Sequence, residues 1–131
     1  IRAGEPIQVP TMQRYTDESD VGEYVELTRD LVRDEREVFA LRVEGESMID
    51  ALVNDGDIVL MRSVPPDVIN EGDMVAAWLN DEESTTLKRF YREGASVVRL
   101  QPANPTMAPI FVRASNVRIQ GKVIAIIRKV A

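Results

Sequence analysis

The chain has 131 residues, which is enough for one domain with a buried core. Its 16 basic and 22 acidic residues give a formal net charge of -6, which argues against the broad basic surface of a nucleic-acid-binding domain. There is no His and no Cys, so disulfides and thiolate zinc sites are excluded. Acid-base chemistry near neutral pH must therefore use Lys, Asp, Glu or Tyr.

The first 36 residues are polar and acidic and predict an irregular arm. Pro6, Pro10 and Gly22 interrupt any periodicity, and only Tyr24 to Val32 has a weak helical or strand-like apolar spacing. No apolar run approaches the roughly 20 residues that a membrane helix needs, and the N-terminus has no signal-peptide pattern. We expect a soluble protein without a membrane anchor.

From residue 37 onward the pattern changes to alternation, with Phe39, Leu41 and Val43 on one face of a half-buried strand. Turn signals separate the later apolar runs. Further strands are predicted at 58–61, 74–79, 84–91, 95–100, 110–112 and 117–130, the last interrupted by Gly121. Short strands at this spacing predict a mostly β fold, with twisted sheets forming a small, partly open barrel and short helical turns.

Ser47 and Lys88 are the candidate catalytic residues. Ser47 ends a glycine-containing loop, and Lys88 lies on the predicted strand 84–91. Serine needs a base, whereas lysine normally titrates near ~10.4 and is protonated at neutral pH. Burial against apolar neighbours lowers a lysine pKa by up to ~3 to 5 units, so a buried Lys88 would be a usable neutral base for Ser47.

Each of these residues also has an ordinary structural interpretation. Most strand lysines are solvated, and strand alternation alone does not say which face of 84–91 meets the core. Ser47 alone could cap a turn over Met48 to Leu52. The backbone N–H groups at the start of that turn, those of Glu46 and Ser47, could equally form an oxyanion hole.

Several motifs occur in an order that resembles the LexA family of self-cleaving S24 peptidases. They are Val43-Glu-Gly-Glu-Ser-Met48, Asn54-Asp-Gly-Asp57 and Thr85-Thr-Leu-Lys-Arg89, followed by the segments 102–105 and 121–130. The resemblance implies a LexA- and signal-peptidase-like β fold. It also implies that Ser47 is the nucleophile, Lys88 the general base, and the Glu46 and Ser47 amides the oxyanion hole.

The resemblance extends to a cleavage site near the N-terminus. Ala3-Gly-Glu-Pro6 is similar to the family's scissile segment, which implies that the Ala3–Gly4 bond is the substrate. The expected organisation is a cleavable arm over residues 1–36 and a serine-lysine peptidase and dimerisation domain over 37–131. Small residues at the bond suit a tight cleft, although an Ala-Gly pair is also common in plain linkers.

The same resemblance predicts the partners of the chain. It implies the C-terminal autoproteolytic and dimerisation domain of an SOS-response transcriptional repressor in the bacterial cytoplasm. We expect a homodimer whose cleavage is stimulated by a RecA filament on single-stranded DNA. Operator DNA would be bound only through an N-terminal winged helix-turn-helix domain that is not among these residues.

No cofactor or metal is expected. Asp50, Asp55, Asp57 and Asp73 lie in predicted turns and lack an EF-hand spacing. The apolar segment 123–127 suits either a core strand or an edge that pairs across a two-fold axis. The alternative functions are a UmuD-like polymerase accessory, a phage repressor of the same fold, or a non-catalytic β-rich dimerisation module.

Overall fold

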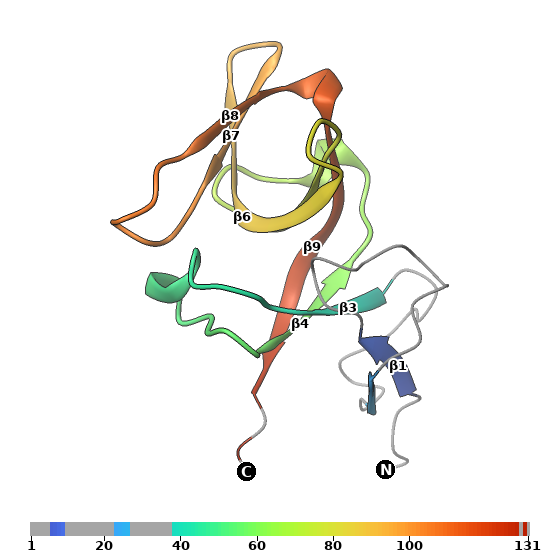
Figure 1. Cartoon of the computed structure of the whole chain (residues 1–131). Helices are drawn as coiled ribbons and strands as arrows, with labels where there is room; N and C mark the ends of the chain where they lie inside the picture. Colours follow the sequence, from blue (N-terminus) through green and yellow to red (C-terminus); the bar gives the residue numbers. More distant parts are fainter. Residues whose placement is uncertain (1–5, 10–22, 27–37, 129, 131) are drawn as a thin grey trace.

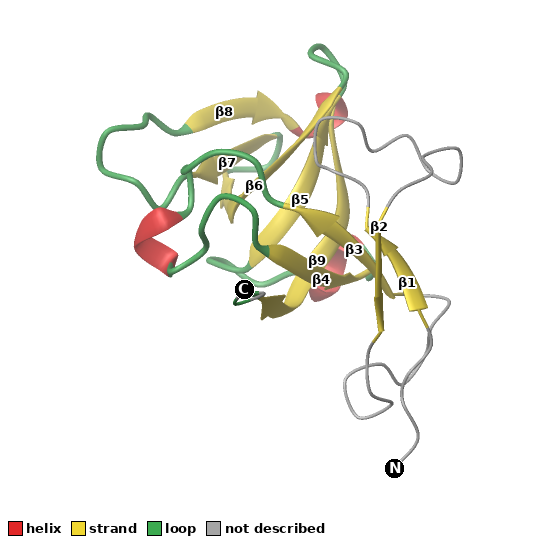
Figure 2. Cartoon of the chain, turned by 60° about the horizontal axis from the view of Figure 1, so that its bottom comes forward, coloured by secondary structure: helices red, strands yellow, loops and turns green. Residues whose placement is uncertain are grey.

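The computed structural model describes residues 6–9, 23–26, 38–128 and 130. The strands are β1 (Pro6–Val9), β2 (Glu23–Glu26), β3 (Val38–Arg42), β4 (Ile58–Arg62), β5 (Met74–Leu79), β6 (Ser84–Glu93), β7 (Val97–Gln101), β8 (Ile110–Arg113) and β9 (Val117–Ile127). Helix occurs in the described ranges only as the 3-10 turns η4 (Ile49–Ala51), η5 (Pro66–Val68) and η6 (Ala114–Asn116) (Figure 2). No helix in this part of the chain is long and apolar enough to cross a membrane.

Seven strands form one antiparallel sheet in the order β3-β4-β9-β5-β6-β7-β8. The long strand β9 joins its two halves, because residues 117–122 pair with β5 and residues 122–127 pair with β4 (Figure 1). The sheet is not closed, since β3 and β8 are its outer strands. The prediction of a mostly β, partly open barrel-like fold is confirmed.

The strands β1 and β2 form a separate two-stranded antiparallel sheet, and β1 lies beside β3 (Figure 1). The sequence predicted an irregular arm here, with at most a weak strand-like spacing from Tyr24. Each strand has only four residues, too few for a clear alternation signal, and each is completed by a partner distant in sequence. The Ala3–Gly4 bond lies outside the described residues.

The buried apolar side chains of the described residues form three clusters, two of which cover the two faces of β6. The first contains Met48 and Leu87, and the second contains Phe90 with buried residues of β5 and β7. Leu87 and Phe90 point to opposite faces of the strand. Lys88 shares the face of Phe90 by strand alternation and is itself buried.

Candidate active site

Ser47 lies in the loop between β3 and η4, which we define as the nucleophile loop, residues 43–48. Gly45 has a φ of +90°, which reverses the chain in a conformation that L side chains rarely adopt. Met48 is 1% exposed and anchors the far end of the loop in the first cluster. Met48 is also the N-cap residue of η4, and no side chain caps the turn, so Ser47 is not a helix cap.

Lys88 lies on strand β6 and contacts Ser47. Its Nζ donates to Ser47 Oγ at 3.1 Å and to Thr86 Oγ1. The Ser47 hydroxyl also lies 3.4 Å from the carbonyl oxygen of Leu87. The structure therefore brings together the two residues that the sequence selected as candidates, although they are 41 positions apart.

The surroundings of Lys88 favour a neutral amine. The residue is 6% exposed, which rules out a solvated surface lysine. Within the described ranges no carboxylate forms an ion pair with its Nζ. Desolvation by burial lowers the pKa of Lys88, because the ammonium is penalised and no negative charge compensates it.

Thr86 is a site residue that the sequence analysis did not assign. It lies two positions before Lys88 on the same face of β6, and its hydroxyl accepts a hydrogen bond from the Lys88 Nζ. This contact fixes the end of a long side chain that would otherwise sample several rotamers. The alternation of the predicted strand was the signal that could have found it.

The nucleophile loop is held from outside by the loop between β7 and β8. Asn104 Nδ2 donates to the carbonyl of Glu46 at 2.8 Å, and the Asp50 amide donates to the carbonyl of Ala103 at 2.7 Å. These bonds place η4 against the β7–β8 loop (Figure 2). In the sequence, residues 102–105 indicated only a family resemblance and gave no signal for these contacts.

The backbone amides predicted as an oxyanion hole remain available. Within residues 38–128 the N–H groups of Glu46 and Ser47 donate no hydrogen bond. The neighbouring Gly45 amide, by contrast, donates to Asp55 Oδ1 at 2.8 Å. Two backbone donors at the start of the turn are thus unpaired within these residues, as an oxyanion hole requires.

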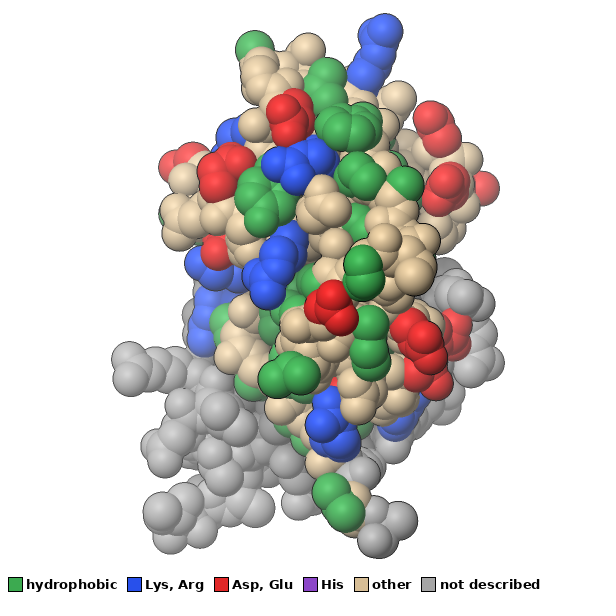
Figure 3. Space-filling view, turned by 90° about the vertical axis from the view of Figure 1, so that its left-hand side faces the viewer, with side chains coloured by type: hydrophobic (Ala, Val, Ile, Leu, Met, Phe, Trp, Pro, Cys, Tyr) green, Lys and Arg blue, Asp and Glu red, His purple; other side chains and the backbone are tan. Residues whose placement is uncertain are grey.

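The surface beside the nucleophile loop is partly apolar. Figure 3 views the side on which η4 and the β7–β8 loop lie, and shows a band of apolar side chains with isolated charges between them. Ile49 in η4, Leu52 directly after η4, and Met107 in the β7–β8 loop are exposed. Exposed apolar side chains beside a candidate nucleophile suit the side chains of an extended peptide.

Two of the four aspartates that were predicted to lie in turns accept backbone hydrogen bonds within those turns. Asp57 Oδ2 accepts from the Asn54 amide at 2.8 Å, and Asp73 Oδ2 accepts from the Asn70 amide at 2.8 Å. Asp57 is paired with Arg128, and Asp73 with Lys122. Among the described residues no group of three or more acidic side chains is arranged to hold a metal ion.

Comparison with known proteins agrees with this geometry. Residues 2–124 match the model of the Peptidase S24-like family. The LexA repressor of Roseiflexus sp. (strain RS-1) is 48% identical over 130 residues, covering 98% of this chain and 56% of the relative. The LexA repressor of Herpetosiphon aurantiacus is 45% identical over 130 residues, covering 98% of this chain and 57% of the relative.

A third relative, the LexA repressor of Bacillus subtilis (strain 168), is 40% identical over 130 residues, covering 99% of this chain and 57% of that protein. The chain belongs to the Peptidase S24-like family. The resemblance to LexA repressors that its motifs indicated is thereby confirmed. The chain spans somewhat more than half the length of these curated relatives.

Proposed function

We propose that this chain is the self-cleaving and dimerising part of a LexA-type SOS repressor, with the Ala3–Gly4 bond as its substrate. The observation that carries the proposal is the contact between Lys88 Nζ and Ser47 Oγ, 3.1 Å long and formed by a lysine that is almost fully buried. A buried lysine without a counter-ion costs stability, so a functional explanation is favoured over a structural one.

In the proposed reaction, neutral Lys88 accepts the proton of Ser47 as Oγ bonds to the carbonyl carbon of Ala3. The carbonyl π electrons move to the oxygen, and the amides of Glu46 and Ser47 stabilise this oxyanion. Collapse of the intermediate breaks the C–N bond, and Lys88 returns the proton to the amino group of Gly4. Water, deprotonated by Lys88, then attacks the Ala3 carbonyl carbon of the acyl-serine. The C–Oγ bond breaks, and Lys88 returns the proton to Ser47 Oγ.

Regulation would act on the position of the arm. An arm that exchanges between a free and a docked position cleaves in proportion to its docked population. We propose that a RecA filament on single-stranded DNA favours the docked state, as the LexA resemblance implies. In a repressor of the bacterial cytoplasm, cleavage would then separate an operator-binding domain from its dimerising partner.

Intact mass spectrometry tests the cleavage. After incubation at alkaline pH, the wild-type chain is expected to lose residues 1–3, whereas Ser47→Ala remains intact because no nucleophile is left. Ser63→Ala removes an exposed serine and is the matched control, which should cleave as the wild type does.

A folded wild-type chain that stays intact at every pH, and also with an activated RecA filament, would contradict the proposal. The chain would then be explained by the alternative function, a non-catalytic β-rich dimerisation module. Cleavage without a repressor function would instead fit a UmuD-like accessory. The similarity to LexA repressors favours the repressor.

We also propose that the chain forms a homodimer through β9. Ile124 and Ile126 are each 40% exposed, whereas Ala125 and Ile127 on the other face pack against the core. Among the described strands, β4 is the only partner of residues 123–127, so one edge of this segment is unpaired. An unpaired apolar strand edge suits antiparallel pairing with a second copy.

Sedimentation equilibrium tests the dimer. Ile126→Glu is expected to shift the chain from dimer to monomer, because it buries a carboxylate in the proposed interface. Val68→Glu places the same charge at an exposed apolar position in η5 and should leave the dimer intact. Equal dissociation of both variants, or a monomeric wild type, would reject β9 as the interface.

A further inference from the structure

The turn before β4, residues 54–57, is bonded directly to the nucleophile loop. The amide of Gly56 donates to the carbonyl of Val43 at 2.9 Å, and the amide of Val43 donates to the carbonyl of Asp57 at 2.8 Å. These reciprocal bonds fix the end of the loop that leaves β3. A further hydrogen bond between the turn and the loop is made by a side chain of the turn.

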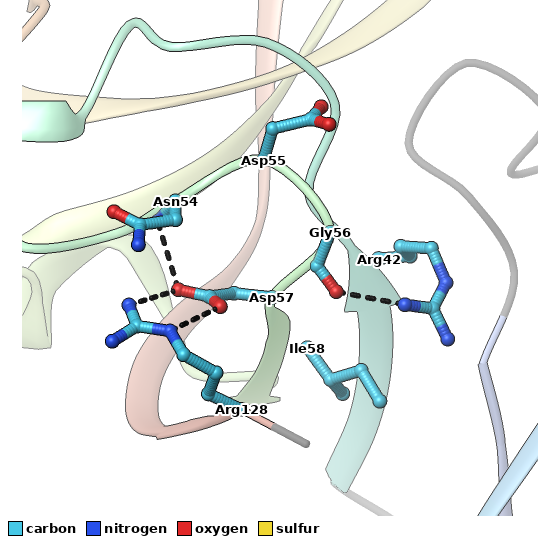
Figure 4. A pocket seen from close by; sticks show the side chains of 7 residues that line it. All are labelled: Arg42, Asn54, Asp55, Gly56, Asp57, Ile58 and Arg128. Atoms are coloured by element: carbon cyan, nitrogen blue, oxygen red, sulfur yellow. Dashed lines mark hydrogen bonds and ion pairs between the residues drawn. The ribbon is translucent and has the colours of Figure 1, made fainter. Parts of the chain in front are cut away.

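That contact comes from Asp55. Its Oδ1 accepts a hydrogen bond from the Gly45 amide at 2.8 Å. Figure 4 shows the Asp55 side chain pointing away from Arg128. The Gly45 amide immediately precedes the amides of Glu46 and Ser47, so this hydrogen bond holds the chain next to the two predicted oxyanion donors.

The turn is itself rigidly held. Arg128 binds both carboxylate oxygens of Asp57, through Nε at 2.8 Å and through its terminal nitrogen at 2.7 Å (Figure 4). The Asp57 side chain is 2% exposed. The hydrogen bonds from Arg128 lower the pKa of Asp57, so the carboxylate stays charged and the bidentate pair persists.

We propose that Asp55 is a positioning residue for the reaction at Ser47. Its carboxylate holds the Gly45 amide and thereby directs the amides of Glu46 and Ser47 toward the developing oxyanion. The turn 54–57 supports the nucleophile loop. The bidentate pair between Arg128 and Asp57 connects this turn to the residue that follows β9. This inference rests on the proposed function, because it assigns a supporting role in the same reaction.

The test compares self-cleavage rates of full-length variants as a function of pH. Asp55→Ala removes the hydrogen-bond acceptor, and we expect cleavage to be about 10- to 100-fold slower, because small displacements of catalytic groups cost up to that much. The midpoint of the pH profile should not move, because Lys88 is untouched. Asp55→Asn keeps an acceptor oxygen without the charge and should restore most of the rate.

Two further measurements separate positioning from a general structural effect. Asp67→Ala removes an exposed carboxylate from η5 and should cleave at the wild-type rate. Urea unfolding should show Asp55→Ala folded under the assay conditions. A slow Asp67→Ala, a shifted pH midpoint, or an Asp55→Asn as slow as the alanine variant would overturn the inference.

A fluorophosphonate probe tests the reactivity of Ser47 independently of the docking of the arm, because the small probe takes the place of the scissile bond. Lys88 accepts the Ser47 proton, the Oγ–P bond forms as fluoride leaves, and the phosphoryl oxygen occupies the oxyanion position. We expect Asp55→Ala to slow this labelling by the same factor as self-cleavage. Unchanged labelling would mean that Asp55 acts on the arm and would overturn the inference alone, whereas a wild-type chain that neither cleaves nor reacts would overturn the proposed function.

Discussion

Lys88→Arg and Lys88→Met are expected to lose self-cleavage by at least about 10²- to 10⁴-fold, the usual contribution of a general base. Arginine keeps the positive charge but does not give up its proton in the accessible pH range. Methionine keeps much of the side-chain volume but offers no basic nitrogen. Both variants should therefore remain intact in the mass-spectrometric assay at pH values where the wild type cleaves.

The pH dependence of the wild type follows from the same residue. Burial lowers the pKa of Lys88 below its ordinary value, and only the neutral amine accepts the Ser47 proton. The rate should rise with pH and level off once the lowered pKa is passed. A rate that levels off only above ~10.4, the ordinary lysine value, would show that burial does not activate the base.

Replacing Lys88 should change stability and activity in opposite senses, because the buried amine that acts as the base also destabilises the fold when it is protonated. Between the lowered folded pKa and the unfolded value near ~10.4, the folded state binds fewer protons than the unfolded state. The wild type therefore gains stability as pH rises through this window. Below it, Lys88→Met should be the more stable protein, and its advantage should shrink toward high pH.

Urea unfolding over a pH series measures this difference. Lys122→Met is the control, because Lys122 is partly exposed and bonded to Asp73 at 3.0 Å. That variant should not gain stability at neutral pH. A Lys88→Met chain that is no more stable than the wild type below the window would contradict a pKa lowered by desolvation.

The strands were predictable wherever local pattern and turn chemistry agree. Residues 74–79 form β5 with the predicted bounds, and the run 58–61 became β4 with one added residue. Both are short apolar runs that follow glycine-containing turns, so their limits are encoded locally. Ser47 and Lys88 were selected by chemical type and by motif order, which are also readable from sequence.

The contacts that shape the site were not predictable, because they join residues far apart in the chain. Arg128 reaches Asp57 across 71 positions, and Asn104 reaches Glu46 across 58. Register shifts between β9 and both of its neighbours also have no local signal. Such features depend on which strands meet, and that is decided by packing of the whole sheet.

Gly121 shows how packing overrides a local signal. The sequence predicted that this glycine interrupts the last strand, yet β9 runs through it from Val117 to Ile127. Gly121 lies under the ring of Phe39, where an added Cβ would be 2.9 Å from Phe39 Cζ and 3.1 Å from Met61 Cβ. The ring of Phe39 from β3 occupies the space that a side chain at position 121 would need. The close packing of this strand therefore requires a glycine here.

Gly121→Ala is therefore expected to destabilise the fold by about 1–3 kcal/mol, the usual cost of overpacking a core. Urea unfolding measures the loss. Phe39→Leu removes the ring atoms nearest to the added methyl group, so the same alanine should cost less in that background. Part of the penalty should remain, because Met61 Cβ is attached directly to the backbone of β4 and moves little. An equal cost in both backgrounds would place the strain elsewhere than at the contact between Gly121 and Phe39.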